Sequence, residues 1–305
     1  MNKYLLSFCI PTNGESRWVV PNVRQIYSLG SDNSIFEVVV ADNNPNEEMD
    51  SAMKEFEKYP NFRYVKTQAK GFYNIVENFV QAKGDFMIKL NHRCILHEGM
   101  IERIYEMGCK YINDKPLMFF SNGALCNNEV REYKSFDEYL YNLSYRSSLS
   151  QGLFFWKEDL ERVGQIKFAP MSPNVSLMFD SRHKSKFVID DRPMSHELDS
   201  TGKYGYDLFN TFAVLYLDLV NEVRIDGSIS KDTFIKVKKD IWKMLANAYF
   251  FMRVLGRKGN YSLAGANESM RIYYSQYDYY SIVMSAYFFI LPKAILSKLF
   301  SFIKH

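Results

Sequence analysis

The chain has 305 residues, of which 47% are hydrophobic and 24% are charged, and this composition excludes collagen-like, coiled-coil and intrinsically disordered chains. Its length predicts one large or two modest globular domains. The formal net charge is only +3, so the chain lacks the overall basic character that drives binding to nucleic acid, which is not an expected partner.

The N-terminal segment and the cysteines indicate where the protein works. The first apolar run has about seven residues and is broken by Pro11, so it is too short for the apolar core of a signal peptide. The four cysteines form neither a C-x-x-C pair nor an alternating Cys/His spacing, which argues against a zinc site or a disulfide framework. We therefore expect a cytoplasmic protein.

The first 125 residues alternate between strand-like and helix-like segments, which is typical of parallel βαβ units and predicts an α/β domain. The clearest helix spans residues 71–83, where Phe72, Ile75, Val76, Phe79 and Val80 form one apolar stripe. The predicted strands are short and apolar enough to be buried on both faces, and they cover residues 5–10, 36–41, 62–65, 86–90 and 117–121.

The pattern changes after residue 150. A strand (GLFFW), a short helix over 157–163 and a strand near 187–189 are expected, followed by long helices over 206–223 and 231–255. We place the domain boundary near Thr201–Gly202, which gives a catalytic domain over 1–202 and a mainly helical region over 203–305.

The C-terminal segment is basic. Residues 231–305 carry 12 Lys and Arg against 4 Asp and Glu, and their longest apolar run, 279–291, is shorter than the roughly 20 residues that a membrane span needs. Residues 293–305 place Ile295, Leu296, Leu299 and Ile303 on one helical face, which predicts a helix lying in a membrane interface. The alternative is a helix packed on its own domain or on a second subunit, so a homo-oligomer is compatible with this segment.

Polar residues follow three of the predicted strands, and ligands of open parallel sheets bind at the carboxyl ends of strands. The sequences at these ends are IPTNG from residue 10, ADNN from residue 41 and KLNHR from residue 89. Asn, Asp, Pro and Gly are also ordinary turn formers, so none of these segments is specific by itself.

The ordered set resembles the family 2 glycosyltransferases of the GT-A fold, and most of all the abequosyltransferase-like branch of bacterial O-antigen and capsule enzymes. SFCIPTNG and EVVVADNNP have the family's spacing, Gly71 and Asn74 fall at its next helix start, and GDFMIKLNHR takes the place of its G-D-Y-I-x-x-L-D-D-D segment. The resemblance implies a Rossmann-like, mostly parallel sheet with helices on both faces. It also implies transfer of a sugar, with inversion, from a nucleotide-diphosphate donor to a glycan hydroxyl.

The resemblance assigns Asp42 to a ring N–H of the nucleotide base and Pro11 and Thr12 to the walls of the base slot. An alternative for Asp42 is capping of a helix that starts near Pro45. The implied nucleotide-sugar site comprises Pro11, Thr12, Asn13, Asp42, Asn43, Gly71, Asn74, Lys89, Asn91 and Arg93.

Family members bind Mg²⁺ or Mn²⁺ through an Asp-x-Asp motif, and here that motif reads Asn91-His92-Arg93. Because Arg cannot bind a cation, we predict no metal site there, and we expect Arg93, helped by Lys89 or His92, to neutralise the diphosphate. The two alternatives are loss of activity, which leaves a protein that binds a glycan or a partner transferase, and a metal held by other ligands.

The catalytic base is also displaced from its family position. GLFFWKEDLERVG fits the segment that precedes the base, yet no acid occurs between Glu161 and Asp180. We expect Asp180 first and His183 second to take the proton of the acceptor hydroxyl. Further candidates are Asp190, Asp191 and His196. The basic C-terminal segment favours a lipid-linked acceptor at the cytoplasmic face of the inner membrane.

Overall fold

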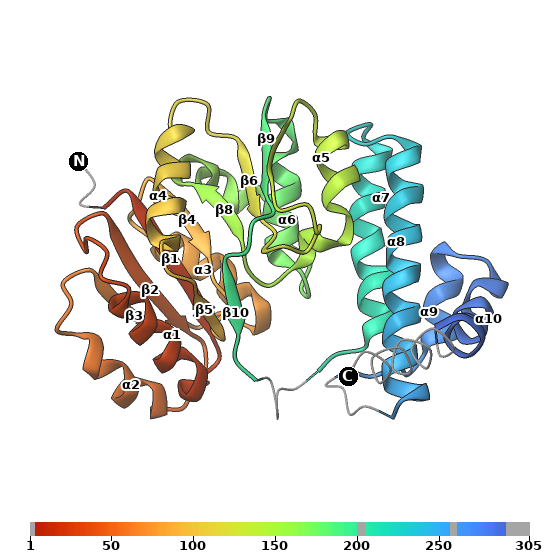
Figure 1. Cartoon of the computed structure of the whole chain (residues 1–305), viewed down its shortest axis with the longest axis horizontal. Coiled ribbons are helices and arrows are strands. Elements are labelled where there is room, and N and C mark those ends of the chain that lie inside the picture. Colours follow the sequence, from red (N-terminus) through yellow and green to blue (C-terminus); the bar gives the residue numbers. More distant parts are fainter. Residues whose placement is uncertain (1–3, 200–204, 257–260, 291–305) are drawn as a thin grey trace, which may run out of the picture. The chain divides into compact units, whose positions relative to one another are not determined.

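The computed structural model describes residues 4–199, 205–256 and 261–290 (Figure 1). The chain divides into two compact units, Met1–Ser200 and Thr201–His305. The first unit is built on a twisted sheet, and the second is mainly helical. The predicted α/β fold class with a helical C-terminal region is confirmed.

The sheet of the first unit has eight strands in the order β3-β2-β1-β4-β8-β6-β9-β7. Strands β1 to β4 are parallel to one another, and β8 runs antiparallel to both β4 and β6. Strand β9 is parallel to β6, whereas β7 is antiparallel to β9. The strands are β1 (Leu6–Thr12), β2 (Phe36–Asp42), β3 (Phe62–Lys66), β4 (Phe86–Lys89), β6 (Leu117–Phe120), β7 (Val130–Tyr133), β8 (Leu153–Trp156) and β9 (Phe187–Asp190).

A second sheet contains only β5 (Cys94–Leu96) and β10 (Ser195–Glu197). The two strands are antiparallel, with Glu197 opposite Cys94. Each strand is three residues long, and the two lie about a hundred positions apart in the sequence. No local sequence pattern therefore predicted them.

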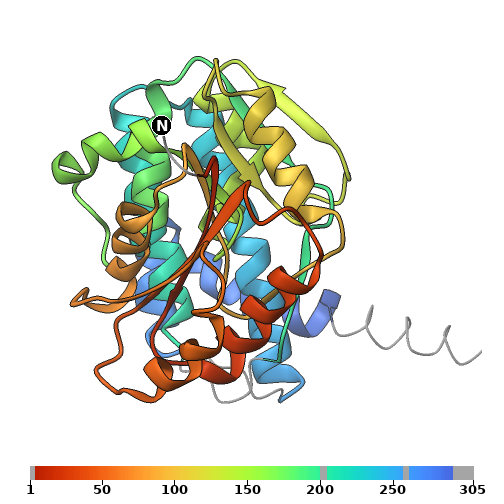
Figure 2. The ribbon, with the colours of Figure 1, turned by 90° about the vertical axis from the view of Figure 1, so that its left-hand side faces the viewer.

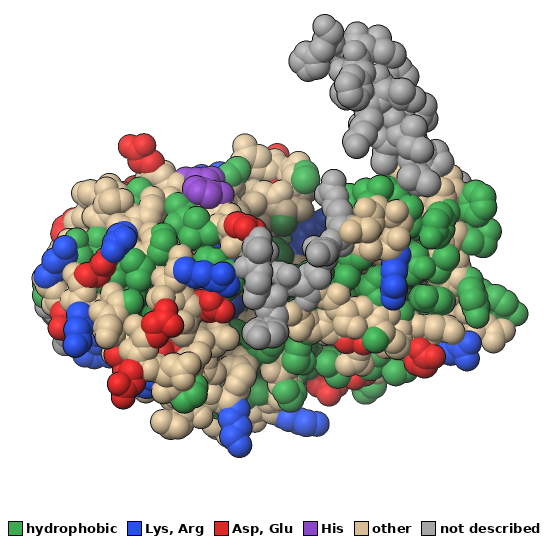
Figure 3. All heavy atoms as spheres, turned by 90° about the horizontal axis from the view of Figure 1, so that it is seen from below, with side chains coloured by type: hydrophobic (Ala, Val, Ile, Leu, Met, Phe, Trp, Pro, Cys, Tyr) green, Lys and Arg blue, Asp and Glu red, His purple; other side chains and the backbone are tan. Residues whose placement is uncertain are grey.

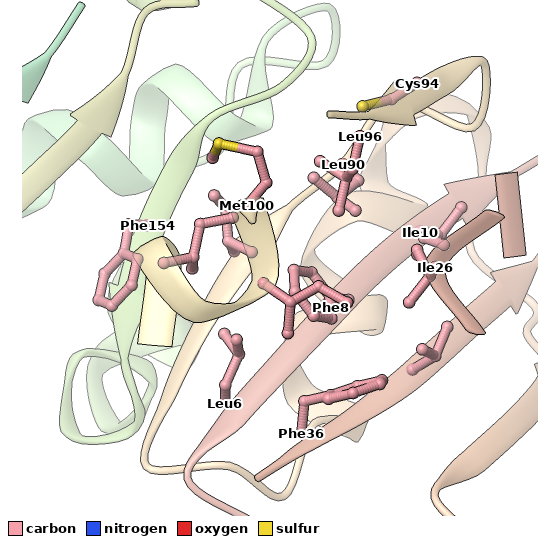
Figure 4. Packing of buried hydrophobic residues seen from close by; sticks show 14 of the residues in the cluster. Leu6, Phe8, Ile10, Ile26, Phe36, Leu90, Cys94, Leu96, Met100 and Phe154 are labelled. Atoms are coloured by element: carbon pink, nitrogen blue, oxygen red, sulfur yellow. The ribbon is translucent and has the colours of Figure 1, made fainter. Parts of the chain in front are cut away.

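Alternation along β1 determines which residues enter the main core. Leu6, Phe8 and Ile10 point to one face, where they pack with Ile26 of α1 (Ser16–Ser28) and Met100 of α4 (Met100–Lys110) (Figure 4). Helix α2 (Glu48–Met53) covers the same face.

The opposite face of the sheet is covered by α3 (Asn74–Gln81), which contacts β1 and β2, and by α6 (Pro173–Asp180), which contacts α3. In Figure 2, α1 and α3 lie on opposite sides of the N-terminal strands. Helices on both faces are therefore confirmed. The first unit also contains α5 (Phe136–Leu143).

Two helix predictions differ from the structure at their ends. The helix expected over 71–83 begins as a 3₁₀ turn, Gly71–Tyr73, and becomes α-helical only from Asn74. Ile75, Val76 and Phe79 are buried, but Phe72 and Val80 are 45% and 51% exposed because the turn precedes the α-helix and Val80 lies in its last turn. The helix expected over 157–163 is a 3₁₀ helix, Lys157–Gln165.

The second unit consists of helices in its described part, apart from one bridge between Asp207 and Ser262. The Ser230 side chain caps α8 (Lys231–Tyr249) by accepting a hydrogen bond from the backbone N–H of Thr233. No helix within residues 4–199, 205–256 and 261–290 is both long and apolar enough to span a bilayer. The amphipathic segment 293–305 lies outside the described residues. The helical elements are a π-helix (Asn210–Tyr216), α7 (Leu217–Ile225), α8 (Lys231–Tyr249), a π-helical turn η7 (Phe250–Val254), α9 (Ala266–Tyr273), α10 (Gln276–Ser285) and a π-helical turn η8 (Ala286–Ile290).

Candidate functional site

The carboxyl ends of the parallel strands form one edge of the main sheet, here called the C-terminal edge. Thr12 at the end of β1 lies opposite Asp42 at the end of β2, and Lys89 ends β4 on the other side of β1. Because β8 is antiparallel to β4, its first residue, Leu153, lies at this edge too. The structure therefore brings the three polar strand ends of the sequence together.

Asp42 is completely buried, and its carboxylate is occupied by groups of the protein itself. One oxygen accepts hydrogen bonds from the Tyr64 hydroxyl and the Lys66 ammonium group, both at 3.0 Å, and the other accepts from the backbone N–H of Asn44 at 2.9 Å. The helix-cap alternative is wrong, because α2 starts only at Glu48. An incoming nucleotide base could reach this carboxylate only if Lys66 or Tyr64 moved.

Several predicted ligand residues hold the strand ends in place. The buried Asn74 side chain donates to the carbonyl oxygens of Thr12 and Ala41, which lie at the ends of β1 and β2. The Asn43 side chain donates to the carbonyl oxygens of Ala69 and Gly71. In this structure these two side-chain amides bind backbone, so they shape the edge.

The loop after β1 is closed against the loop after β2. The Asn44 side chain donates to the carbonyl oxygen of Asn13 at 2.7 Å, and it packs directly on Gly14. Gly14 has φ +91°, and a Cβ atom there would lie 2.6 Å from the Asn44 amide nitrogen. Only glycine allows this close approach. Asn13 itself is exposed and Pro11 is half-buried at the same edge.

The segment Asn91–Arg93 lies at this edge and is almost entirely buried. The imidazole Nδ1 of His92 is 3.2 Å from the Thr12 hydroxyl, and its ring packs 5.2 Å from the indole of Trp18 on α1. The Arg93 guanidinium lies over the same indole at 5.7 Å. His92 and Arg93 are thus held by the first helix of the domain.

Lys89 and Asn91 face the residues that precede β8. Lys89 donates its ammonium group to the carbonyl oxygen of Ser150, and Asn91 donates its amide to the Ser150 hydroxyl at 2.6 Å. The Asn91 side-chain oxygen accepts from the backbone N–H of Arg93 at 3.1 Å. Both side chains are therefore engaged with neighbouring loops, and Arg93 contacts an acidic residue.

That acidic residue is Glu197 on β10, which the sequence analysis missed. Its carboxylate accepts from the Arg93 guanidinium at 2.9 Å and from the Asn91 amide at 3.3 Å. The Glu197 side chain is 39% exposed and that of Arg93 is 10% exposed. The local sequence Ser-His-Glu resembles a loop and does not indicate a functional role for Glu197. Only the pairing of β10 with β5 brings this residue to Arg93.

The donor set at this segment does not fit the divalent cation that the resemblance implies. Mg²⁺ and Mn²⁺ prefer several oxygen ligands, usually carboxylates. Glu197, the carboxylate that contacts Asn91 and Arg93, is paired with a guanidinium that repels a metal ion. Across residues 4–199, 205–256 and 261–290, no group of three or more His, Cys, Asp or Glu could hold a metal ion.

Asp180 and His183, expected to be catalytic, are not brought to the C-terminal edge. Asp180 ends α6, His183 lies in the 3₁₀ turn that follows it, and both line a cavity of about 280 Å³ together with Lys115 and Lys184. Lys115 precedes β6, so this cavity is at the opposite edge of the sheet. Asp180 pairs with Arg162 at 3.0 Å, and His183 Nδ1 is 2.8 Å from the Asp180 carbonyl oxygen. Helix α6 carries its last residues away from the strand ends, so Asp180 and His183 lie apart from the other predicted site residues.

The later candidates reach the edge but have other partners. Asp190, at the end of β9, pairs with Arg103 and Arg192. Asp191 is buried and accepts from the Ser121 hydroxyl and from three backbone N–H groups of residues 125–128. Burial raises the pKa of Asp191, but these hydrogen bonds lower it more, so its pKa lies below the ordinary value. The exposed His196 stacks on His97 with ring centroids 5.8 Å apart.

Comparison with known proteins places the fold. Neither a protein-family model nor a curated protein matches the sequence. Among solved structures, S. aureus TarS in complex with UDP-GlcNAc has a TM-score of 0.56 at 12% identity, over 92% of this chain and 81% of that chain. The mannosyltransferase PcManGT from Pyrobaculum calidifontis, in complex with GDP-Man and Mn²⁺, has a TM-score of 0.51 at 13% identity, over 92% and 85%. These likenesses show that the fold is of the GT-A type.

Proposed function

We propose that this protein is a glycosyltransferase of the family 2 type that moves a sugar from a nucleotide-diphosphate donor to a hydroxyl of a glycan. The observation that carries the proposal is the C-terminal edge, where the polar ends of β1, β2 and β4 meet beside a guanidinium. Ligands of open parallel sheets bind at this edge, and two proteins of the same fold were solved with UDP-GlcNAc and GDP-Man.

The transfer is inverting and does not use a metal. The acceptor oxygen forms a bond to the anomeric carbon while the bond from that carbon to the phosphate oxygen breaks, and the nucleoside diphosphate leaves with the electron pair. A base removes the acceptor proton. Arg93 stabilises the negative charge on the departing diphosphate, because a planar guanidinium can bind two phosphate oxygens at once.

The acceptor in this proposal is a lipid-linked precursor of a bacterial surface polysaccharide such as a capsule or an O-antigen. Residues 293–305 support it, since they combine an apolar helical face with Lys293, Lys298 and Lys304 and contain no acidic residue. The protein would then work peripherally at the cytoplasmic face of the membrane.

The second candidate function is a protein of the same fold that binds a glycan or a partner transferase without catalysis. Two observations favour it. The Asp42 carboxylate already accepts hydrogen bonds from Tyr64 and Lys66, and the charge of Arg93 is already neutralised by Glu197. A donor would have to displace or share both sets of contacts.

A thermal-shift screen separates the two functions. UDP, GDP, CDP and dTDP are each added with and without Mn²⁺, and a bound nucleotide raises the melting temperature by linkage. The transferase proposal expects one nucleotide to stabilise the protein and Arg93→Gln to abolish that stabilisation. Arg24→Gln is the matched control, because Arg24 forms an Arg–Glu pair with Glu55 on the exposed side of α1. No response to any nucleotide would support the binding protein.

A further inference from the structure

One helical face of the second unit presents large apolar side chains to solvent. Tyr277, Tyr280, Met284, Tyr287 and Phe288 lie on α10 and η8, and Tyr277 and Phe288 are 70% and 68% exposed. Their spacings of three, four, three and one residues place them on the same side of the helix. We call these five residues the aromatic face.

The other side of the same helix is anchored within the unit. Ile282 and Ala286 are fully buried, and the indole N–H of Trp242 on α8 donates to the Ser281 hydroxyl at 3.2 Å and to the Asp278 carbonyl oxygen at 3.3 Å. The unit therefore folds with the aromatic face turned outwards.

Neighbouring residues enlarge the apolar surface. Turn η7 contacts η8, and its Phe251 and the following Leu255 are 41% and 42% exposed. In Figure 3, hydrophobic side chains lie at the surface of the right-hand part of the molecule. Exposed apolar side chains gathered in this way are typical of an interaction site.

The charge of the C-terminal part of the sequence favours an anionic occupant. Residues 231–305 carry 12 Lys and Arg against 4 Asp and Glu, whereas residues 1–230 carry 26 against 31. A basic segment with an exposed apolar face complements an anionic lipid surface, which offers negative headgroups above an apolar interior. Tyr side chains suit this boundary because their rings are apolar and their hydroxyls stay hydrated.

We propose that the aromatic face docks on an anionic lipid bilayer, with its rings at the level of the headgroups. The inference goes beyond membrane contact by residues 293–305, because these five side chains belong to a folded helix that is anchored on α8. A folded contact orients the unit at the membrane, which a terminal segment alone does not do. The proposal does not depend on the transfer reaction.

The test measures binding of the full chain to vesicles by co-sedimentation. The vesicles contain phosphatidylcholine with or without about one third phosphatidylglycerol, at low and high salt. The double variant Met284→Glu/Phe288→Glu is expected to bind the anionic vesicles at least ~10-fold more weakly, because two charged side chains replace apolar ones in the contact. Wild type is expected to bind the anionic vesicles more strongly than the neutral ones, and less strongly at high salt.

The matched control is Ile225→Glu/Ile235→Glu. These residues are 70% and 51% exposed in the same unit, and they lie near the loop between α7 and α8, far along α8 from η7. The control adds the same charge and is expected to retain most of the vesicle binding. Equal binding of both double variants and wild type would overturn the proposal. Unchanged vesicle binding with a dimer that becomes a monomer in the Met284/Phe288 variant would overturn it in favour of a second copy of the chain.

Discussion

Arg93 and Glu197 form an ion pair of 2.9 Å although they are 104 residues apart in the sequence. The pair exists because β10 lies antiparallel to β5, with Glu197 opposite Cys94. In the proposed function Arg93 takes the place of the family's metal ion, and the structure shows that this guanidinium already has a carboxylate counter-ion.

Removing that counter-ion is expected to strengthen donor binding. In Glu197→Gln, the diphosphate no longer competes with a carboxylate for Arg93, so the Kd of the nucleotide found in the screen is expected to fall about 10-fold, or about 1.4 kcal/mol. Isothermal titration calorimetry measures the Kd. Glu158→Gln is the control, because Glu158 pairs with Lys115 at the opposite edge of the sheet. A higher Kd in Glu197→Gln would mean that the carboxylate orients Arg93 for the donor.

Chelation is expected to leave transfer unchanged. The donor set around Asn91 and Arg93 does not fit a divalent cation, and in the proposed function the guanidinium supplies the positive charge instead. Turnover of the identified donor is measured in excess EDTA and again after addition of Mn²⁺. Loss of turnover in EDTA, with recovery in Mn²⁺, would contradict the assignment of Arg93 as the substitute cation.

Asp42→Asn is expected to lower both stability and nucleotide binding. The carboxylate is completely buried and pairs with Lys66, so the amide leaves that ammonium group with only the surface carboxylate of Asp50 as a counter-ion and costs about 2 kcal/mol in the free energy of unfolding. Urea unfolding measures this loss, and thermal shift measures the loss of nucleotide stabilisation. Asp50→Asn is the control, since Asp50 contacts the same Tyr64 and Lys66 from the surface and a smaller change is expected. Equal effects of the two variants would refute a special role of Asp42.

Asp191 makes a stability contribution that depends on pH. Its folded-state pKa is lowered, so the ionised group stabilises the fold above the unfolded-state pKa of about 3.9, and this stability is lost as pH falls through the folded-state pKa. The difference in unfolding free energy between wild type and Asp191→Asn is expected to be largest near neutral pH and to shrink below about pH 4. Urea unfolding at several pH values measures it. A difference that does not change with pH would mean that the carboxylate charge is not what holds the loop.

Gly152→Ala tests the geometry that joins three strands at the C-terminal edge. The Gly152 N–H donates to the Lys89 carbonyl oxygen, and its own carbonyl oxygen accepts from the Phe120 N–H. With φ +88° and a Cβ that would lie 1.9 Å from the Phe120 carbonyl oxygen, alanine is expected to cost about 3 kcal/mol or more. Gly164→Ala, where nothing lies within 4 Å of the added atom, is expected to be nearly neutral. Equal unfolding free energies for the two variants would contradict the described backbone.

Local sequence patterns were sufficient for the central strands and for the edge at which they end. The apolar runs of β1, β2 and β4 and the polar residues that follow them are short-range features, and parallel strands must end on the same side of a sheet. The same patterns did not reveal what Asn74 does. An Asn that bridges two strand ends and an Asn that binds a ligand can stand in the same local sequence, and here the side chain bridges the strand ends.

Residues far apart in the chain decided the rest. The direction of α6 placed Asp180 and His183 at the opposite edge of the sheet, and the pairing of two three-residue strands placed Glu197 against Arg93. Periodicity and composition report on neighbours within a few positions, whereas these contacts depend on how the chain returns to the sheet after about a hundred residues. Hence the central strands and their polar edge were predictable from the sequence alone. Only the folded structure shows that the positive charge of Arg93 at this edge is paired with the negative charge of Glu197.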